Sequence, residues 1–202
     1  MSEADMTEAG MSGLTPPPGD VSPNSFVSPT FFVGTLPPPA LSVRISDWQA
    51  RLEHVITAPH VTLKAPGQYR AAPLTAFGQV CGRTSPFEVA IGGVRTFPDR
   101  VIYLEAVGAG LKALHTELVA ATGPPPGAFE LAGYQPHLTL ALGWRPLRLD
   151  WPEVLASAQE EFAALEAEPL RFTVREVVLF RKDRPGERYQ EETRWKLKGQ
   201  SG

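Results

Sequence analysis

The chain has 202 residues, with 19 Lys and Arg, 22 Asp and Glu, four His and a single Cys. This length is enough to bury a core in one domain or two small lobes. The lone Cys81 excludes a disulfide scaffold and a cysteine-based zinc site, and it fits a reducing compartment. No apolar run approaches the roughly 20 residues of a membrane span, and the N-terminus lacks a secretion signal pattern. We therefore expect a cytoplasmic protein that does not enter a membrane.

The net charge of −3 argues against a strongly cationic surface that coats nucleic acid, and the charge is unevenly distributed. Residues 1–30 hold four acidic residues, five prolines and no Lys or Arg, whereas residues 31–202 hold 18 acidic and 19 basic residues. The first segment has few large apolar side chains with which to offset its ordering entropy. The sequence predicts a disordered, acidic, proline-rich tail over residues 1–30 and a single folded domain over residues 31–202.

Apolar periodicity predicts alternating strands and helices in the first half of the domain. Residues 31–34 have the pattern of a short buried strand, and residues 41–52 carry apolar side chains on one helical face. Residues 60–64 follow as a strand that Pro66 is expected to stop, and residues 74–81 form a second predicted helix.

The second half continues this mixture. The pattern predicts strands at 87–91 and 101–104, with a bulge or turn at Gly92-Gly93, and then a helix at 111–121 and a stiff loop at 123–127. A strand is predicted within 134–142, followed by a helix that Asp150 caps and that extends through Leu165. Two long strands at 170–180 and 188–197, joined by a turn, complete the set. Adjacent strands near the C-terminus favour an α+β fold over a doubly wound parallel sheet. The chain has neither a Walker loop nor a dinucleotide-binding glycine pattern.

One short pattern occurs twice. Residues 59–63 read Pro-His-Val-Thr-Leu and residues 136–140 read Pro-His-Leu-Thr-Leu, each inside a predicted strand and 77 residues apart. Two such matches among four histidines would arise by chance with a probability of about one in ten thousand at ordinary composition. The pair is therefore a strong signal, although either copy alone is a weak one.

Strand geometry gives the pattern a chemical meaning. Residues i and i+2 share a face, so His60 projects with Thr62 and His137 with Thr139, while the intervening apolar residues point into the core. Because the ordinary pKa of an imidazole lies near neutral pH, two imidazoles can serve as general acid and general base. The threonine hydroxyls can donate hydrogen bonds to phosphate oxygens. This set suits an in-line displacement at phosphorus without a metal ion. A metal site is disfavoured because no carboxylate or Cys accompanies either His at ligand spacing.

The paired motifs resemble those of the 2H phosphoesterase superfamily, which includes bacterial 2′-5′ RNA ligases and RNA 2′,3′-cyclic phosphodiesterases. The resemblance covers residues 31–197 and implies a bilobal α+β fold with pseudo-twofold symmetry. In that fold, antiparallel or mixed sheets line a central cleft, helices lie outside, and each lobe supplies one motif. It also implies that His60, Thr62, His137 and Thr139 are the catalytic residues. The RNA-ligase branch often has a basic residue near the position of Leu142, whereas the nearest one here is Arg145.

Other residues are weaker candidates. Lys64 shares a strand face with His60 if the strand is regular and could bind phosphate; Arg145 and Trp144 could hold a phosphate and stack on a base. His54 and His115 lack a partnered motif and are assigned to structure. Phe97, Tyr134 and Tyr189 are possible stacking residues for which packing is the simpler explanation.

The sequence thus predicts a cofactor-free, metal-independent monomeric enzyme that acts on 2′,3′-cyclic phosphate ends of RNA or nucleotides. Hydrolysis would give a 2′-phosphate, and attack by a 5′-hydroxyl end would give 2′-5′ ligation. Two alternatives stay open. One is a noncatalytic RNA- or nucleotide-binding module, and the other is a cyclic phosphodiesterase for a small metabolite that is not RNA.

Overall fold

The computed structural model describes residues 29–97, 101–123 and 126–199. The predicted tail therefore lies outside the described residues except for its last two positions, as do residues 124–125 of the predicted stiff loop. The strands are β1 (Thr30–Thr35), β2 (Val61–Gly67), β3 (Phe87–Phe97), β4 (Val101–Val107), β5 (His137–Leu142), β6 (Leu170–Val174), β7 (Glu176–Lys182) and β8 (Gln190–Lys196). The helices are α1 (Pro39–Arg51), α2 (Ala71–Arg83), α3 (Ala109–Ala120), α4 (Trp151–Glu161), α5 (Ala164–Ala167) and the 3₁₀ turn η1 (Leu131–Gly133).

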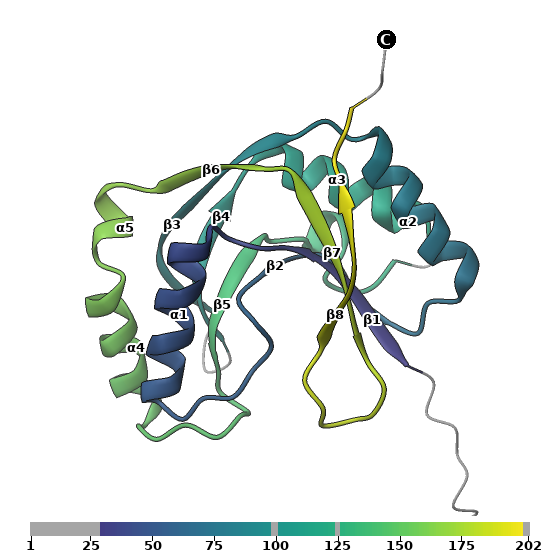
Figure 1. Cartoon of the computed structure of the whole chain (residues 1–202). Helices are drawn as coiled ribbons and strands as arrows, with labels where there is room; N and C mark the ends of the chain where they lie inside the picture. Colours follow the sequence, from purple (N-terminus) through teal and green to yellow (C-terminus); the bar gives the residue numbers. More distant parts are fainter. Residues whose placement is uncertain (1–28, 98–100, 124–125, 200–202) are drawn as a thin grey trace, which may run out of the picture.

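All eight strands form one curled sheet in the order β6-β3-β4-β5-β2-β1-β7-β8, with every neighbouring pair antiparallel (Figure 1). The two motif strands, β2 and β5, lie side by side at its centre. They pair only at Val61 and Leu138. On either side of this junction the motif strand is followed by the strand that precedes it in the chain, β1 beside β2 and β4 beside β5, in keeping with pseudo-twofold symmetry. The mixture of helices with one antiparallel sheet confirms the predicted α+β fold.

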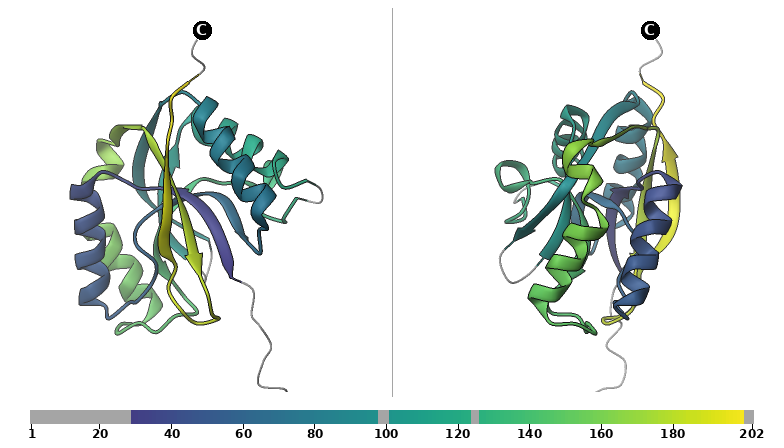
Figure 2. Two further views of the ribbon diagram at one scale, coloured as in Figure 1. Left: turned by 45° about the vertical axis from the view of Figure 1, so that its right-hand side comes forward. Right: turned by 90° about the vertical axis from the view of Figure 1, so that its left-hand side faces the viewer.

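The helices pack outside the sheet and also respect this symmetry. Each motif strand is preceded by a strand and a helix, namely β1 and α1 before β2, and β4 and α3 before β5. Figures 1 and 2 show α1 and α4 along one side of the molecule and α2 and α3 along the other. Helix α3 contacts β2 as well as β3, and α1 contacts β5, so each of these two helices reaches the motif strand of the other half.

The predicted strand at 170–180 is in fact two strands separated by Arg175. β6 pairs with β3 at one end of the sheet, and β7 pairs with β1 near the other end. Arg175 alone connects β6 to β7, because the sheet curls until its two ends approach each other. The Leu197 N–H donates to the Arg175 carbonyl at 2.8 Å, which ties the end of β8 to the crossing.

Two other predicted boundaries were wrong. β2 continues through Pro66 to Gly67. On the side that faces β5, β2 pairs only at Val61, so a proline at position 66 removes no hydrogen bond to β5. The helix capped by Asp150 ends at Glu161, and Leu165 belongs to the separate α5.

Several local predictions are confirmed. Asp150 caps α4 through a reciprocal capping box with Glu153. The β3–β4 register shifts between Ile91 and Val94, so Gly92-Gly93 lie at a bulge. Cys81 is buried in the core, and burial raises the pKa of its thiol to about 12. None of the helices in the described part of the chain has the length and apolar character needed to cross a membrane.

Candidate functional site

A pocket of about 640 Å³ opens where the two halves of the sheet meet, and we call it the central pocket. It is lined by Phe32, Ile56, Thr57, Pro59, His60, Thr62, Leu63, Ala65, Pro66, Phe97, His115, Phe129, Gly133, Tyr134, Gln135, His137, Thr139, Leu142, Trp144 and Tyr189. All four residues of the duplicated motif are therefore brought together in one cavity, as the strand pattern predicts.

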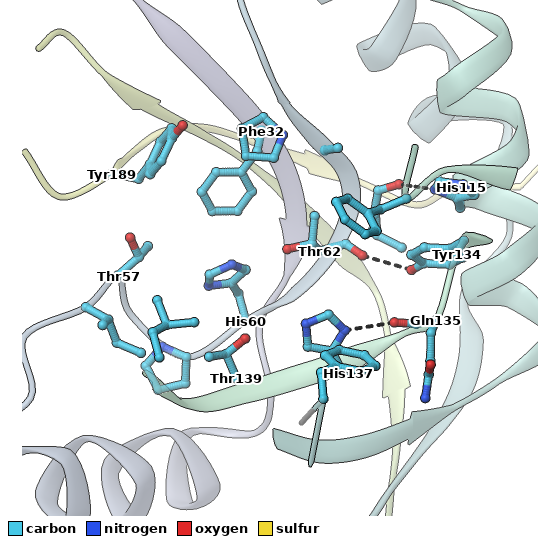
Figure 3. Close-up of a pocket in the computed structure, with 18 of the residues that line it drawn as sticks. Phe32, Thr57, His60, Thr62, His115, Tyr134, Gln135, His137, Thr139 and Tyr189 are labelled. Atoms are coloured by element: carbon cyan, nitrogen blue, oxygen red, sulfur yellow. Dashed lines mark hydrogen bonds between the residues drawn. The ribbon is translucent and has the colours of Figure 1, made fainter. Parts of the chain in front are cut away.

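The two motif histidines are held in the same way. The Nδ1 of His60 donates to the Ala58 carbonyl at 2.7 Å, and the Nδ1 of His137 donates to the Gln135 carbonyl at 2.8 Å. Because a carbonyl only accepts, Nδ1 carries the hydrogen, and the neutral ring keeps its lone pair on Nε2. Figure 3 shows the two rings side by side among the residues that line the pocket. The arrangement leaves both Nε2 atoms for chemistry.

Each of these imidazoles is backed by two aromatic rings. His60 lies 4.6 Å from Phe32 and 5.4 Å from Phe180, measured between ring centroids. On the other half, His137 lies 5.2 Å from both Phe97 and Tyr103. These aromatic contacts restrict the position of each imidazole and partly bury it.

This apolar setting favours the neutral form of both rings. Burial and, to a smaller extent, the charge of His137 together lower the pKa of His60 to about 4, although the hydrogen bond to the Ala58 carbonyl raises it. Burial also lowers the pKa of His137. Since each charge disfavours the other, protonation of one ring hinders protonation of the second.

The motif threonines flank the histidines. Thr62 and Thr139 both line the central pocket, and Figure 3 shows them on opposite sides of the two rings. The Tyr134 hydroxyl donates to the Thr62 backbone carbonyl at 2.8 Å and so fixes β2 from the adjoining loop. Hydroxyls placed in this way can donate to oxygens on an atom held between the histidines.

The prediction that Lys64 faces the pocket was wrong. The β1–β2 register shifts between the pairs Gly34–Thr62 and Val33–Lys64, so a bulge breaks the alternation after Thr62. Lys64 is buried, 4% exposed, and it forms an ion pair with the buried Glu130. Ala65 takes the place in the pocket lining that regular alternation assigns to Lys64.

The two other predicted substrate-binding residues, Trp144 and Arg145, lie in different pockets. Trp144 lines the central pocket and is 58% exposed. Arg145 instead lines a neighbouring hollow with Trp151. Leu142 reaches the central pocket, and none of the lining residues in the described part of the chain is Lys or Arg. Within those same residues, no group of three or more His, Cys, Asp or Glu could hold a metal ion.

Sequence reasoning missed several lining residues. Thr57, Phe129 and Gln135 lie in loops, where periodicity gives no signal, and Phe32 has the pattern of a core residue. Phe97, Tyr134 and Tyr189, considered above as packing residues, line the pocket as well.

A comparison with known protein families decides which family this is. The model of the 2′-5′ RNA ligase superfamily matches residues 37–186, which include both motifs. The chain belongs to the 2′-5′ RNA ligase superfamily. This match confirms the resemblance to the 2H phosphoesterases that the paired motifs indicated. A search of curated protein sequences found no match.

Solved structures share the fold of this superfamily member. TT0787 of Thermus thermophilus aligns with a TM-score of 0.59 and 19% identity over 84% of this chain and 98% of that one. A structure described as a phosphoesterase aligns at 0.56 and 20% identity over 84% and 98%. LigT of E. coli in complex with 3′-AMP aligns at 0.55 and 21% identity over 86% and 99%. At these identities the likeness establishes the fold alone.

Proposed function

We propose that the protein is a metal-independent phosphoesterase that hydrolyses the 2′,3′-cyclic phosphate of RNA ends or nucleotides to a 2′-phosphate. The observation that carries this proposal is the pair of imidazoles in one pocket, each with Nδ1 bound to a carbonyl and Nε2 available. One Nε2 takes a proton from the attacking water as the new P–O bond forms. The other gives a proton to O3′ as the P–O3′ bond breaks.

The electrostatics of the pair support this division of labour. An anionic phosphate favours protonation of a nearby imidazole, whereas mutual repulsion opposes a second proton. The bound state is therefore expected to have one charged and one neutral ring, as acid–base catalysis requires. Either ring can take either role, since the roles exchange when the reaction runs backwards.

The remaining polar groups would stabilise the transition state. Thr62 and Thr139 would donate to the two nonbridging oxygens, where negative charge grows as water attacks. If the 5′-hydroxyl of a second RNA end replaced water, the same groups would join the ends through a 2′-5′ linkage. LigT of E. coli is a fold relative with structures that contain 3′-AMP, ATP and phosphate, which supports a nucleotide or phosphate ligand here.

The test is turnover of a 2′,3′-cyclic phosphate oligonucleotide in the presence of EDTA. His60→Ala and His137→Ala should each lower kcat by about 10²–10⁴-fold, the usual contribution of one acid–base group. Thr116→Ala, on the exposed face of α3, is the matched control and should retain full activity. Unchanged activity in both histidine variants, or activity that EDTA abolishes, would refute the proposal.

Substrate size is settled by comparing three compounds in the same assay. These are a cyclic-ended oligonucleotide, a 2′,3′-cyclic mononucleotide, and a small cyclic phosphate without a nucleobase. Preference for either of the first two supports the proposed substrate class. Fastest turnover of the third would move the substrate to a small metabolite, and binding without turnover would make the protein a noncatalytic module.

A further inference from the structure

The two histidines outside the motifs each join a pocket loop to the body of the protein. His115, on α3, donates from Nδ1 to the Leu63 carbonyl of β2 at 2.8 Å. Its Nε2 accepts the backbone N–H of Leu131 at 2.8 Å. The ring therefore bridges the centre of the sheet and the loop of residues 126–134, which we call the Phe129 loop.

His54 makes the corresponding contacts on the other side of the pocket. Its Nδ1 donates to the Pro146 carbonyl at 2.9 Å, and its Nε2 accepts the Leu142 N–H at 3.1 Å. These contacts hold both ends of the segment 142–146, which we call the Trp144 loop. Both histidines thus use one nitrogen as a donor and the other as an acceptor, which only the neutral ring can do.

The two loops carry exposed aromatic side chains at the mouth of the central pocket. Phe129 is 81% exposed and Trp144 is 58% exposed, and both line the pocket. Large apolar rings left in contact with water beside a cavity are typical of surfaces that bind a flat or apolar part of a ligand. Their positions depend on the loop backbones, which the histidines hold.

Backbone strain marks the same places. Among the described residues, the only non-glycine residues with positive φ are Glu53, at 54°, and Leu131, at 53°. Glu53 directly precedes His54, and the N–H of Leu131 is the one that His115 accepts. A left-handed conformation costs about 1–2 kcal/mol in a residue with a side chain, so each segment needs contacts that hold it.

We propose that His54 and His115 are positioning residues that latch the Trp144 loop and the Phe129 loop at the mouth of the pocket, and that protonation of either histidine releases its loop. Protonation turns Nε2 into a donor that faces a backbone N–H donor. The hydrogen bond is then lost, and two like-oriented dipoles repel. Neither histidine transfers a proton to the substrate.

The charged surroundings set the direction of this response. Burial lowers the pKa of His115, the charge of Lys64 on β2 also lowers it, and the charge of Glu130 in the Phe129 loop raises it. The ring of Tyr134 stacks on the His115 ring with 3.8 Å between centroids. For His54, burial and the charge of Arg145 lower the pKa. A latched ring therefore resists protonation more than a released one, so falling pH favours the released loop.

Hydrogen exchange of the Leu131 and Leu142 amides tests the latches without any turnover, so this test is independent of the proposed phosphoesterase activity. Between pH 8 and pH 5, protection corrected for intrinsic exchange should fall by up to about 30-fold at both amides if the released ring has an ordinary pKa near 6.5. His115→Gln should abolish the pH dependence at Leu131 only, because the Gln oxygen accepts the N–H but does not titrate. His54→Gln should do the same at Leu142 only.

Two further variants keep the proposal falsifiable if a Gln variant is unstable. His60→Gln is the matched control and should leave the pH dependence at both amides intact. Leu131→Gly should raise protection at its own amide by relieving the positive φ. Protection in the unaltered protein that does not change with pH, or that falls equally in all three His→Gln variants, would overturn the proposal.

If the proposed function holds, the latches also affect catalysis through substrate binding. Release of a loop should raise KM with little change in kcat, because the rings that contact substrate move while the motif histidines stay in place. A loss of activity on 2′,3′-cyclic AMP that is confined to kcat would contradict a positioning role. Absence of any turnover would count against the phosphoesterase proposal and leave the exchange result standing.

Discussion

At the scale of single residues, the central pocket stabilises neutral imidazoles before any ligand arrives. His60 lies against Phe32 and Phe180, and burial lowers its pKa to about 4. At neutral pH the empty site therefore holds no proton for a leaving group. An anionic phosphate would raise the pKa of the ring it touches, and that ring would then take up a proton from water. On this account the substrate itself completes the acid–base pair.

The low pKa of His60 also predicts how stability varies with pH. Between pH 6.5 and pH 4 the unfolded chain binds a proton at this ring while the folded chain does not, so stability falls as pH falls. The shift corresponds to a loss of up to about 3 kcal/mol. His60→Gln should therefore lose up to about 3 kcal/mol less stability than the unaltered protein between pH 7 and pH 4.5, measured by urea unfolding. Equal losses in the two proteins would contradict the assignment.

At the scale of elements, the bulge in β2 decides what Lys64 does. It turns the ammonium away from the pocket and into an ion pair with Glu130, beneath the Phe129 loop. Glu130 also accepts the Gly127 N–H at 2.8 Å. Although burial alone would raise the pKa of Glu130, these bonds outweigh it and the pKa is lowered. The buried ion pair between Lys64 and Glu130 therefore attaches the Phe129 loop to β2.

This arrangement predicts an asymmetry between single and double substitutions. Lys64→Met leaves the Glu130 carboxylate buried without its cation and should cost about 3–5 kcal/mol of unfolding free energy. Lys64→Met combined with Glu130→Gln should cost less than Lys64→Met alone, because the buried charge is gone. Chemical denaturation at pH 7 measures both. A double variant that is less stable than the single one would show that the pair does more than neutralise charge.

The contrast between Lys64 and the motif residues shows what a sequence can predict. Alternation placed His60 with Thr62 and His137 with Thr139, and all four line the pocket, although β2 begins one residue after His60. It failed two residues later because a bulge depends on how β1 pairs, and that pairing is not visible in β2. The strand predicted over 170–180 failed for a similar reason, since its apolar pattern is continuous while its partners change at Arg175. The loops that carry Phe129 and Trp144 follow no period at all.

At the scale of the whole molecule, the two halves of the sheet differ in how the chain builds them. The half around β5 is contiguous and spans β3 to β6, residues 87–174. The half around β2 combines β1 and β2 with β7 and β8, from opposite ends of the chain. The halves pair only at Val61 and Leu138, so the pocket forms along a junction with little backbone pairing of its own.

The charge distribution around that junction predicts a weak response to salt. The described lining of the pocket contains no Lys or Arg, so a phosphate bound between the histidines, as proposed, would make the main electrostatic contact. For a 2′,3′-cyclic mononucleotide, kcat/KM should change by less than about threefold between 50 and 200 mM salt, as expected for one contact. Extending the substrate to ten nucleotides should add little. A fall of a hundredfold or more would reveal a cationic track for a polynucleotide.

The place of β7 in the sheet has a consequence for synthesis of the protein. Phe180 stands behind Phe32 at 4.5 Å and beside His60, yet it is made 120 residues after that histidine. Tyr189, which lines the same pocket, is made later still. Both motifs are therefore synthesised before Phe180 and Tyr189 are available to pack around the first motif. A chain that stops between Thr139 and Phe180 carries every motif residue but keeps only Phe32 of the two rings that contact His60, so hydrolysis should require synthesis beyond Phe180.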